Sequence, residues 1–311
     1  MAGTLRKLNA LDFSTLMWQS AKLENLDSLR VVTNGEPMSV MGMASSLFAQ
    51  NHAGIVLEDN AKTLAMARAI QWQDEDFAQL QFITSLESKD INTVAVIESL
   101  LKEIGGWGIT RVMGDLPVNS VYLSDFRKAN FIIWASHRCY SLKIAHDETP
   151  KGSAWHTWSA KDYADMQTVY QTLVAARIRC YEPMTRSKVL GKVFRDARGK
   201  LIAYADLDYG SRGIWAQLFF LPEATRPEIL DALAKELFEE YGRPVTFSAR
   251  SYMPWLRGAL DVLATEVSEE RGLIARHLAV KGHAPQTVTE KLFEKNPAES
   301  GAFTIQPDVK S

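Results

Sequence analysis

Two periodicities of apolar residues follow one another along the second half of the chain. The run Ile214–Leu221 is almost continuously apolar, which predicts a central strand covered on both faces, and Pro222 ends it. From Arg226 to Tyr241, apolar residues recur three and four positions apart, the period of a helix that faces a core. Two strand-like runs at 192–196 and 200–208 flank turn-forming residues and predict a hairpin.

The same reasoning assigns the remaining elements, and both halves give them in the same order. In the second half, we expect helices at 160–179 and 253–263 and strands at 245–249 and 272–280. In the first half, we expect helices at 13–29, 91–104 and 121–129 and strands at 54–57, 64–72, 77–83, 110–114 and 132–142. Each half therefore has the pattern of an α+β domain.

A shift of 138 residues aligns the two halves. Leu64-Ala-Met-Ala67 then falls on Ile202-Ala-Tyr-Ala205, and Phe77–Phe82 falls on Trp215–Phe220. Agreement in order, pattern and element type over about 80 residues indicates a duplicated domain. We therefore predict domains at 1–145 and 154–282, a polar linker at 146–153 and a flexible tail at 283–311.

Composition narrows the class of protein. The chain has 311 residues, with 46% hydrophobic residues and a formal net charge of −2, which favours a folded globular protein over a disordered one. The near-neutral charge supplies no drive toward nucleic acid or an anionic membrane, so neither is expected as a partner. The chain has two cysteines, which are too few for a disulfide framework. No apolar run has the length of a signal peptide or a membrane span. We expect a cytoplasmic location.

The histidines and serines give no established catalytic motif. No HExxH sequence and no Cys/His spacing suited to zinc occurs, so no metal is expected. No serine lies in a nucleophile elbow. Cys139 and His277 fall opposite each other in the repeat, where strand alternation favours core or strand-face positions, and a Cys/His site is the alternative.

The order of elements resembles the GNAT superfamily of acyl-CoA-dependent N-acyltransferases, some of which are tandem proteins. The segment Leu116–Phe131 is similar to the family's strand, loop and helix before a Gly-Phe pair, with Asn130 in place of the glycine. Leu221-Pro222 resembles the family's exit from its fourth strand, and Arg271–Lys281 resembles its last strand. The resemblance implies two tandem GNAT-like α+β domains, each with a mixed, mostly antiparallel sheet flanked by helices.

The resemblance also implies a site for acetyl-CoA or another acyl-CoA in the second half. Leu218, Phe220 and Leu221 would pair with the pantetheine. The following turn would face the phosphates, and it consists of Thr225, Arg226, Pro227, Glu228, Ile229 and Leu230.

This turn departs from the family's pattern, Arg/Gln-x-x-Gly-x-Gly/Ala, in which backbone N–H groups approach the pyrophosphate. Glu228 and Leu230 replace the two glycines, and Pro227 removes an amide donor. The first half has Glu87 and Asp90 at the equivalent turn. Repulsion between unit charges about 4 Å apart at a surface is on the order of 4 kcal/mol, which disfavours a dianion. Capping of a helix start is the structural explanation of these carboxylates.

The general acid that protonates the leaving thiolate is commonly a tyrosine of the helix before the Gly-Phe pair. Phe126 occupies that place in the first half, and Leu260 or Asp261 occupies it in the second. Neither Phe nor Leu can donate a proton, and Asp261 could do so only with a strongly raised pKa, so the sequence assigns no catalytic residue. Tyr122 and Tyr252 lie about a helical turn away, and we expect them to serve in packing.

A basic cluster near the end of the early helix of the second half is the predicted substrate contact. In the resembling family this stretch often walls the acceptor cleft, so Arg177, Arg179 and Arg186 would bind an anionic substrate, or phosphates through bidentate hydrogen bonds. The alternative is a solvated helix end, since cations stabilise helix C-termini.

Two functions follow from these patterns. One is acyl transfer from CoA to an amine without a covalent enzyme intermediate, with at least one half degenerate. The other is a non-catalytic tandem pair that binds a small ligand or a protein partner. The missing glycines and tyrosine favour the second, while the complete element order fits both.

Overall fold

The structure, a computed structural model, describes residues 3–9, 12, 22–37, 39, 50–60, 62–71, 76–86, 91–142, 155–185 and 191–278. Predictions for the linker at 146–153, the tail at 283–311, Arg186, Glu87 and Asp90 lie outside these residues.

The second half follows the predicted order closely. It consists of β8 (Trp155–Thr157), η2 (Ala160–Asp162), α6 (Tyr163–Leu173), η3 (Ala176–Ile178), β9 (Lys192–Arg195), β10 (Leu201–Tyr209), β11 (Ile214–Phe220), η4 (Pro222–Ala224), α7 (Pro227–Tyr241), β12 (Val245–Arg250), α8 (Pro254–Leu263), β13 (Ala264–Val267) and β14 (Arg271–His277). The helix predicted at 160–179 begins with η2, which runs directly into α6, and it is interrupted before η3 because Val174 adopts an extended conformation. The short strands β8 and β13 were not predicted.

The first half consists of β1 (Thr4–Lys7), β2 (Lys22–Asn25), α2 (Ser28–Asn34), β3 (Asn51–Asp59), β4 (Lys62–Gln71), β5 (Phe77–Ser85), α4 (Thr93–Ile104), η1 (Gly105–Trp107), β6 (Arg111–Pro117), α5 (Leu123–Lys128) and β7 (Ile132–Leu142). The helix predicted at 13–29 is wrong over its described part, since β2 occupies its place and α2 starts only at Ser28. Pairing of β2 with β5, a contact between distant segments, decides this. Asp27 caps α2 by accepting a hydrogen bond from the Arg30 amide at 3.1 Å.

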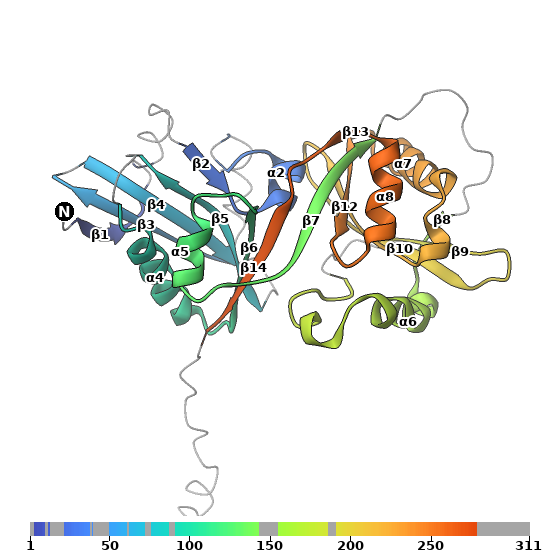
Figure 1. The fold of residues 1–311 in the computed structure, drawn as a ribbon, viewed down its shortest axis with the longest axis horizontal. Helices are drawn as coiled ribbons and strands as arrows, with labels where there is room; N and C mark the ends of the chain where they lie inside the picture. The colour runs from blue at the N-terminus through green and yellow to red at the C-terminus, as the bar shows by residue number, and fades with distance from the viewer. Residues whose placement is uncertain are drawn as a thin grey trace, which may run out of the picture. The chain divides into compact units, whose positions relative to one another are not determined.

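One mixed sheet runs through both halves, because each half contributes a strand to the other (Figure 1). Strand β14, from the second half, lies between β6 and β7 and is antiparallel to both. The C-terminal part of β7, from the first half, lies between β12 and β13. The predicted boundary between the halves therefore separates strands that pair with one another, and the two parts of the sheet are joined by backbone hydrogen bonds.

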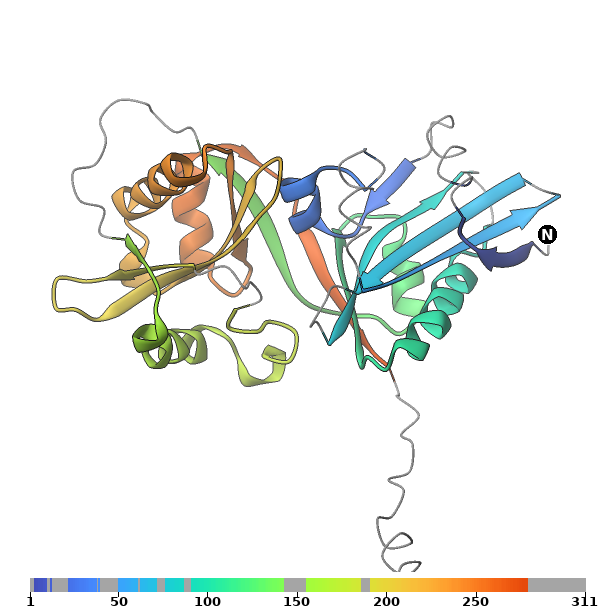
Figure 2. The same cartoon turned by 180° about the vertical axis from the view of Figure 1, so that it is seen from behind.

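The cores lie between the sheet and its helices, as Figure 2 shows from behind. In the second half, Phe219 of β11 contacts Tyr170 of α6, while its neighbour Phe220 contacts Trp155, whose indole donates to the Ile229 carbonyl of α7 at 3.0 Å. Successive strand residues face opposite sides, so α6 covers one face and α7 the other. Strand β11 is buried on both faces, as its apolar run predicted.

Local signals set the ends of α7. Pro227 begins the helix, where a missing N–H costs no hydrogen bond. Gly242 ends it with φ of 64°, and its amide donates to the Phe238 carbonyl at 2.7 Å. Within the helix, Glu236 and Glu240 each lie 2.7 Å from the buried Lys192 ammonium of β9, which fastens α7 to the sheet.

Candidate functional site

Strands β11 and β12 separate at the C-terminal end of β11. They pair in parallel from Ile214 with Val245 to Gln217 with Ser248. Beyond that pair, β11 continues to Phe220 without further pairing to β12, and the Trp255 indole donates a hydrogen bond to the Phe220 carbonyl at 2.9 Å. The backbone of β11 therefore has an opening on this side, which we call the β11/β12 opening, and a side chain lies in it.

The equivalent opening in the first half is filled by the chain itself. Strands β5 and β6 pair only from Phe77 with Arg111 to Gln79 with Met113. Farther along, β2 pairs with β5 in antiparallel fashion over Phe82–Ser85. Leu26 then bridges both strands, since its amide donates to the Gln81 carbonyl at 2.9 Å and its carbonyl accepts from the Asp115 amide at 3.0 Å. No edge of β5 remains there for an extended ligand.

The turn predicted to face phosphates lies between η4 and α7. Thr225, Arg226 and Glu228 lie on or near the surface, whereas the Ile229 and Leu230 side chains are buried in the core. The amides of Ile229 and Leu230 donate to the Arg226 carbonyl at 3.0 and 3.4 Å, and Pro227 has no amide hydrogen. Few amides of this turn are directed outward, and an exposed carboxylate stands beside them.

The predicted pantetheine contacts are buried core residues. Leu218 and Phe220 are 0% exposed and Leu221 is 8% exposed. Their backbone, and not their side chains, borders the β11/β12 opening. The structure thus brings these residues together with the turn at Thr225–Leu230 along the end of β11, and their role in binding stays a prediction.

Of the predicted basic cluster, the structure describes Arg177 and Arg179, and Arg179 has a local structural role. Arg179 donates to the Val174 and Gln171 carbonyls at 2.9 and 3.0 Å, and its guanidinium lies 5.8 Å from the centre of the Tyr170 ring. These contacts close the C-terminal end of α6, as the helix-end alternative expects. Arg177 is exposed. Neither residue contributes to the pocket described below.

The positions of the expected general acid hold no accessible phenol. Phe126 and Leu260 are buried apolar side chains, and Asp261 is exposed. A fully buried phenol enters this core from the other half, because β7 places Tyr140 opposite Phe247 of β12. Tyr140 packs in the same apolar core as Leu218, and burial with the nearby Asp261 raises its pKa to about 12. Such a group keeps its proton at neutral pH. No sequence pattern indicated it, because it belongs to the first half.

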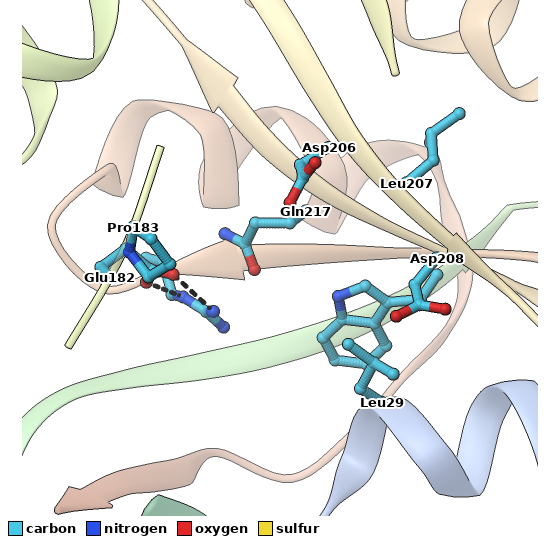
Figure 3. A pocket seen from close by; sticks show the side chains of 9 residues that line it. Leu29, Glu182, Pro183, Asp206, Leu207, Asp208 and Gln217 are labelled. Atoms are coloured by element: carbon cyan, nitrogen blue, oxygen red, sulfur yellow. Dashed lines mark hydrogen bonds and ion pairs between the residues drawn. The ribbon is translucent and has the colours of Figure 1, made fainter. Parts of the chain in front are cut away.

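A pocket opens on the α6 side of β11, close to the last β11/β12 pair (Figure 3). Its cavity volume is about 20 Å³, which is room for about one water molecule. The lining comes from three strands, the segment after η3 and α2 of the first half, and consists of Leu29, Glu182, Pro183, Asp206, Leu207, Asp208, Trp215, Gln217 and Arg250. Sequence reasoning did not select this set. Its signals were a polar residue, Gln217, in an apolar strand and two aspartates at alternate positions of β10.

The two charged residues at one end of the pocket neutralise each other. Arg250 donates to Glu182 from Nε at 2.5 Å and from Nη2 at 3.1 Å, which dashed lines mark in Figure 3. Burial lowers the pKa of Arg250, but the Glu182 carboxylate more than offsets this and raises it. The Tyr252 hydroxyl also donates to Glu182, at 3.3 Å.

A hydrogen-bonded chain continues from this ion pair into the first half. Arg250 Nη1 donates to Ser248 Oγ at 3.2 Å, and Ser248 Oγ lies 3.2 Å from His137 Nδ1. On the far side, Arg271 of β14 donates from Nε to Asp115 at 2.5 Å. Burial alone would raise the pKa of Asp115, but Arg271 and hydrogen bonds hold it well below its usual range.

No group of three or more His, Cys, Asp or Glu side chains suited to a metal ion occurs among the residues that the structure describes. Within the same residues, no helix has the length and apolar character needed to span a membrane.

Comparison with known proteins identifies the fold. No protein-family profile matches the chain, and no curated protein sequence matches it. Among solved structures, the chain is similar to a GCN5-related N-acetyltransferase from Sphaerobacter thermophilus, with a TM-score of 0.50 and 10% identity over 88% of this chain and 95% of that one. It also matches a tandem GNAT protein from the clavulanic acid biosynthesis pathway, with a TM-score of 0.45 and 15% identity over 89% and 98% of the two chains.

The match to the Sphaerobacter protein extends over both halves of the chain. The predicted α+β architecture of GNAT type is therefore confirmed. Because the two sequences are only 10% identical, the similarity establishes the fold and nothing further. This chain, with its large mixed sheet flanked by helices, has the fold of the GNAT N-acyltransferases.

Proposed function

We propose that the protein transfers an acyl group from acyl-CoA to an amine, and that the second half alone binds the acyl-CoA. One observation carries the proposal. Strands β11 and β12 separate after Gln217 and Ser248, whereas β2 occupies the corresponding place in the first half. The first half then serves as a scaffold that supplies β7 and closes the pocket with Leu29.

The β11/β12 opening gives an extended acyl-CoA arm a backbone edge to pair with. The Phe220 carbonyl accepts from Trp255 in the free protein, so the arm would replace that hydrogen bond with one of its own. In the reaction, the amine nitrogen forms a bond to the thioester carbonyl carbon, the carbon–sulfur bond breaks, and the amine loses a proton as the thiolate gains one. We assign that proton to Tyr140, a phenol that β7 of the first half brings into this core.

The turn before α7 supports a second candidate, a non-catalytic pair of GNAT-like domains that binds a small ligand or a protein partner. Glu228 is exposed at the turn, and the amides of Ile229 and Leu230 are directed to the Arg226 carbonyl. A CoA pyrophosphate would meet a carboxylate and few free donors there.

Titration of acetyl-CoA by calorimetry, with thermal stability in parallel, separates the two candidates. Ligand at about 100 times its dissociation constant stabilises the fold by about 2.7 kcal/mol. Glu228→Gln should tighten binding because it removes the repulsion, and Glu239→Gln, at the exposed far end of the same helix, should not. If millimolar acetyl-CoA changes neither the heat of titration nor the thermal stability, the acyltransferase proposal is refuted and the non-catalytic candidate is supported.

Turnover tests the proton donor separately. Tyr140→Phe should lower kcat by about 10²-fold or more and leave acetyl-CoA affinity unchanged, because only the transferred proton is lost. Tyr122→Phe is the control, since Tyr122 is a buried tyrosine of the first half. Equal activity of the Tyr140→Phe protein would remove Tyr140 from the mechanism.

A further inference from the structure

Two residues of β11 direct their backbone groups into the β11/β12 opening. The Ile214 amide donates to the Pro244 carbonyl, next to the start of β12, at 2.9 Å, whereas the Leu221 amide donates to β10 on the other side. Successive residues of a strand direct their N–H and C=O groups to opposite edges. Leu218 and Phe220 lie an even number of positions from Ile214 and beyond the last β11/β12 pair, so they face the opening. A ligand that pairs with β11 there must reach these two residues.

Trp255 occupies this edge of β11. It is the second residue of α8, and its indole N–H donates to the Phe220 carbonyl at 2.9 Å. The ring packs against the core of the second half and is half-buried. Because part of the ring is already exposed, a change of rotamer can move it toward solvent without breaking the core. One side chain therefore holds the backbone acceptor that an extended ligand needs.

The first half closes its opening in a less reversible way. There β2 forms four backbone pairs with β5, and Leu26 hydrogen-bonds to both β5 and β6. Removing β2 would break several backbone hydrogen bonds and expose Leu26, which is 0% exposed. Moving Trp255 breaks one hydrogen bond, which changes an equilibrium constant by about two- to ten-fold. Only the closure of the second half is therefore weak enough for a ligand to reverse.

We propose that Trp255 is the gate of the β11/β12 opening, whose indole covers the edge of β11 in the free protein and turns outward when an acyl-CoA arm pairs with Phe220. This inference rests on the proposed function for the identity of the ligand. Only the open form binds, so the apparent dissociation constant exceeds the intrinsic one by the inverse of the open fraction. The gate also protects the protein, because an uncovered strand edge is a template for pairing with other chains.

Calorimetry with acetyl-CoA tests the gate in the full chain. Trp255→Phe keeps an aromatic ring but has no N–H, so it should bind acetyl-CoA about two- to ten-fold more tightly than the wild type. Trp158→Phe is the matched control, because Trp158 is also half-buried against the same core but directly follows β8. It should leave the affinity unchanged. Equal or weaker binding by the Trp255→Phe protein would overturn the gate.

Two further measurements follow the movement of Trp255. In the wild type, the observed rate of acetyl-CoA binding should level off at the rate of gate opening, and Trp255→Phe should raise this limit. Acetyl-CoA should also make wild-type tryptophan fluorescence more accessible to acrylamide, because the indole moves into solvent, and this change should be absent in Trp255→Phe. Quenching of the wild type needs no variant to fold, and unchanged quenching of the ligand-bound wild type would overturn the gate.

The outcomes separate this inference from the proposed function. Acetyl-CoA binding that Trp255→Phe leaves unchanged or weakens would refute the gate and leave the acyltransferase standing. Binding by Trp255→Phe alone would support the gate and show that the wild type is closed, which refutes its activity as a transferase. No binding by either protein at millimolar acetyl-CoA would refute both.

Discussion

Asp115 fastens the exchanged strand β14 to the first half, so its replacement by asparagine tests the shared sheet. Its carboxylate accepts from the Ser28 amide at 2.9 Å, from Ser28 Oγ at 2.6 Å and from Arg271 Nε at 2.5 Å. The side chains of Asp115 and Arg271 are 9% and 11% exposed. Three segments distant in sequence therefore depend on one buried charge.

The expected cost follows from the burial of the partner. Asp115→Asn keeps the side-chain shape but leaves the Arg271 guanidinium with only the exposed Glu269 carboxylate, 3.7 Å away, as an ion-pair partner. Breaking a buried ion pair costs about 3–5 kcal/mol, and we expect a loss near the lower end of this range. The pair Lys200–Glu223 is the control, since its side chains are 61% and 49% exposed and such pairs contribute about 0–1 kcal/mol. Glu223→Gln should therefore change stability little.

Urea unfolding measures both variants. With an m value of about 3 kcal/mol/M, Asp115→Asn should lower the midpoint by about 1 M or more without changing m. The double variant Asp115→Asn with Arg271→Met should recover part of the loss, because it removes the unpaired charge. If Asp115→Asn costs no more than Glu223→Gln, the ion pair does not hold the exchanged strand.

Three further predictions address other parts of the fold. Lys192→Met should lower the free energy of unfolding, measured in urea, by about 2 kcal/mol, because Glu236 and Glu240 lose the cation that they share. This value lies between those typical of surface ion pairs and of buried ion pairs. No loss of stability would mean that these two contacts contribute nothing. Gly242→Ala should lower the free energy of unfolding by about 1 kcal/mol, because φ there is 64°. Gly258→Ala, inside α8 with no atom near the added Cβ, should raise it by about as much. A change in the same direction for both variants would contradict this backbone explanation. Burial lowers the pKa of His137 despite Asp115, so the unfolded chain binds the proton more readily and stability falls as pH drops below about 6.5; His137→Gln should flatten the slope between pH 7 and 5, and an unchanged slope would contradict this.

Elements with strong local patterns could be predicted from the sequence. The apolar run at Ile214–Leu221 became β11, and the helical period after Arg226 became α7, which Pro227 and Gly242 delimit. Both patterns report burial on a face or along a stripe, a property that the local sequence carries.

The helix predicted at 13–29 failed over its described part because β2 gains its hydrogen bonds from β5, more than fifty residues away. The sequence also did not predict that β7 and β14 each pair with strands of the other half, because the apolar pattern of a strand is the same whichever half it joins. Strand partners are long-range choices, and a pattern of period two does not encode them.

For the candidate site, the sequence located the end of β11 and the turn before α7, and these do lie together. The sequence reasoning selected Arg179, whose N–H groups donate to carbonyls at the end of a helix. It did not select Gln217 and Asp208, because the role of a polar residue in a strand depends on which residues surround it in the folded protein. Tyr140 entered the second half's core by strand exchange.

The sequence by itself determined the α+β class and the elements with strong local patterns, such as β11 and α7, because apolar period and turn residues act over a few positions. Tertiary structure alone decided which half has an opening beside its central strand, which strands the halves share, and which polar side chains meet in a pocket. Those outcomes depend on contacts between distant segments, where burial and charge pairing are settled only once the chain has folded.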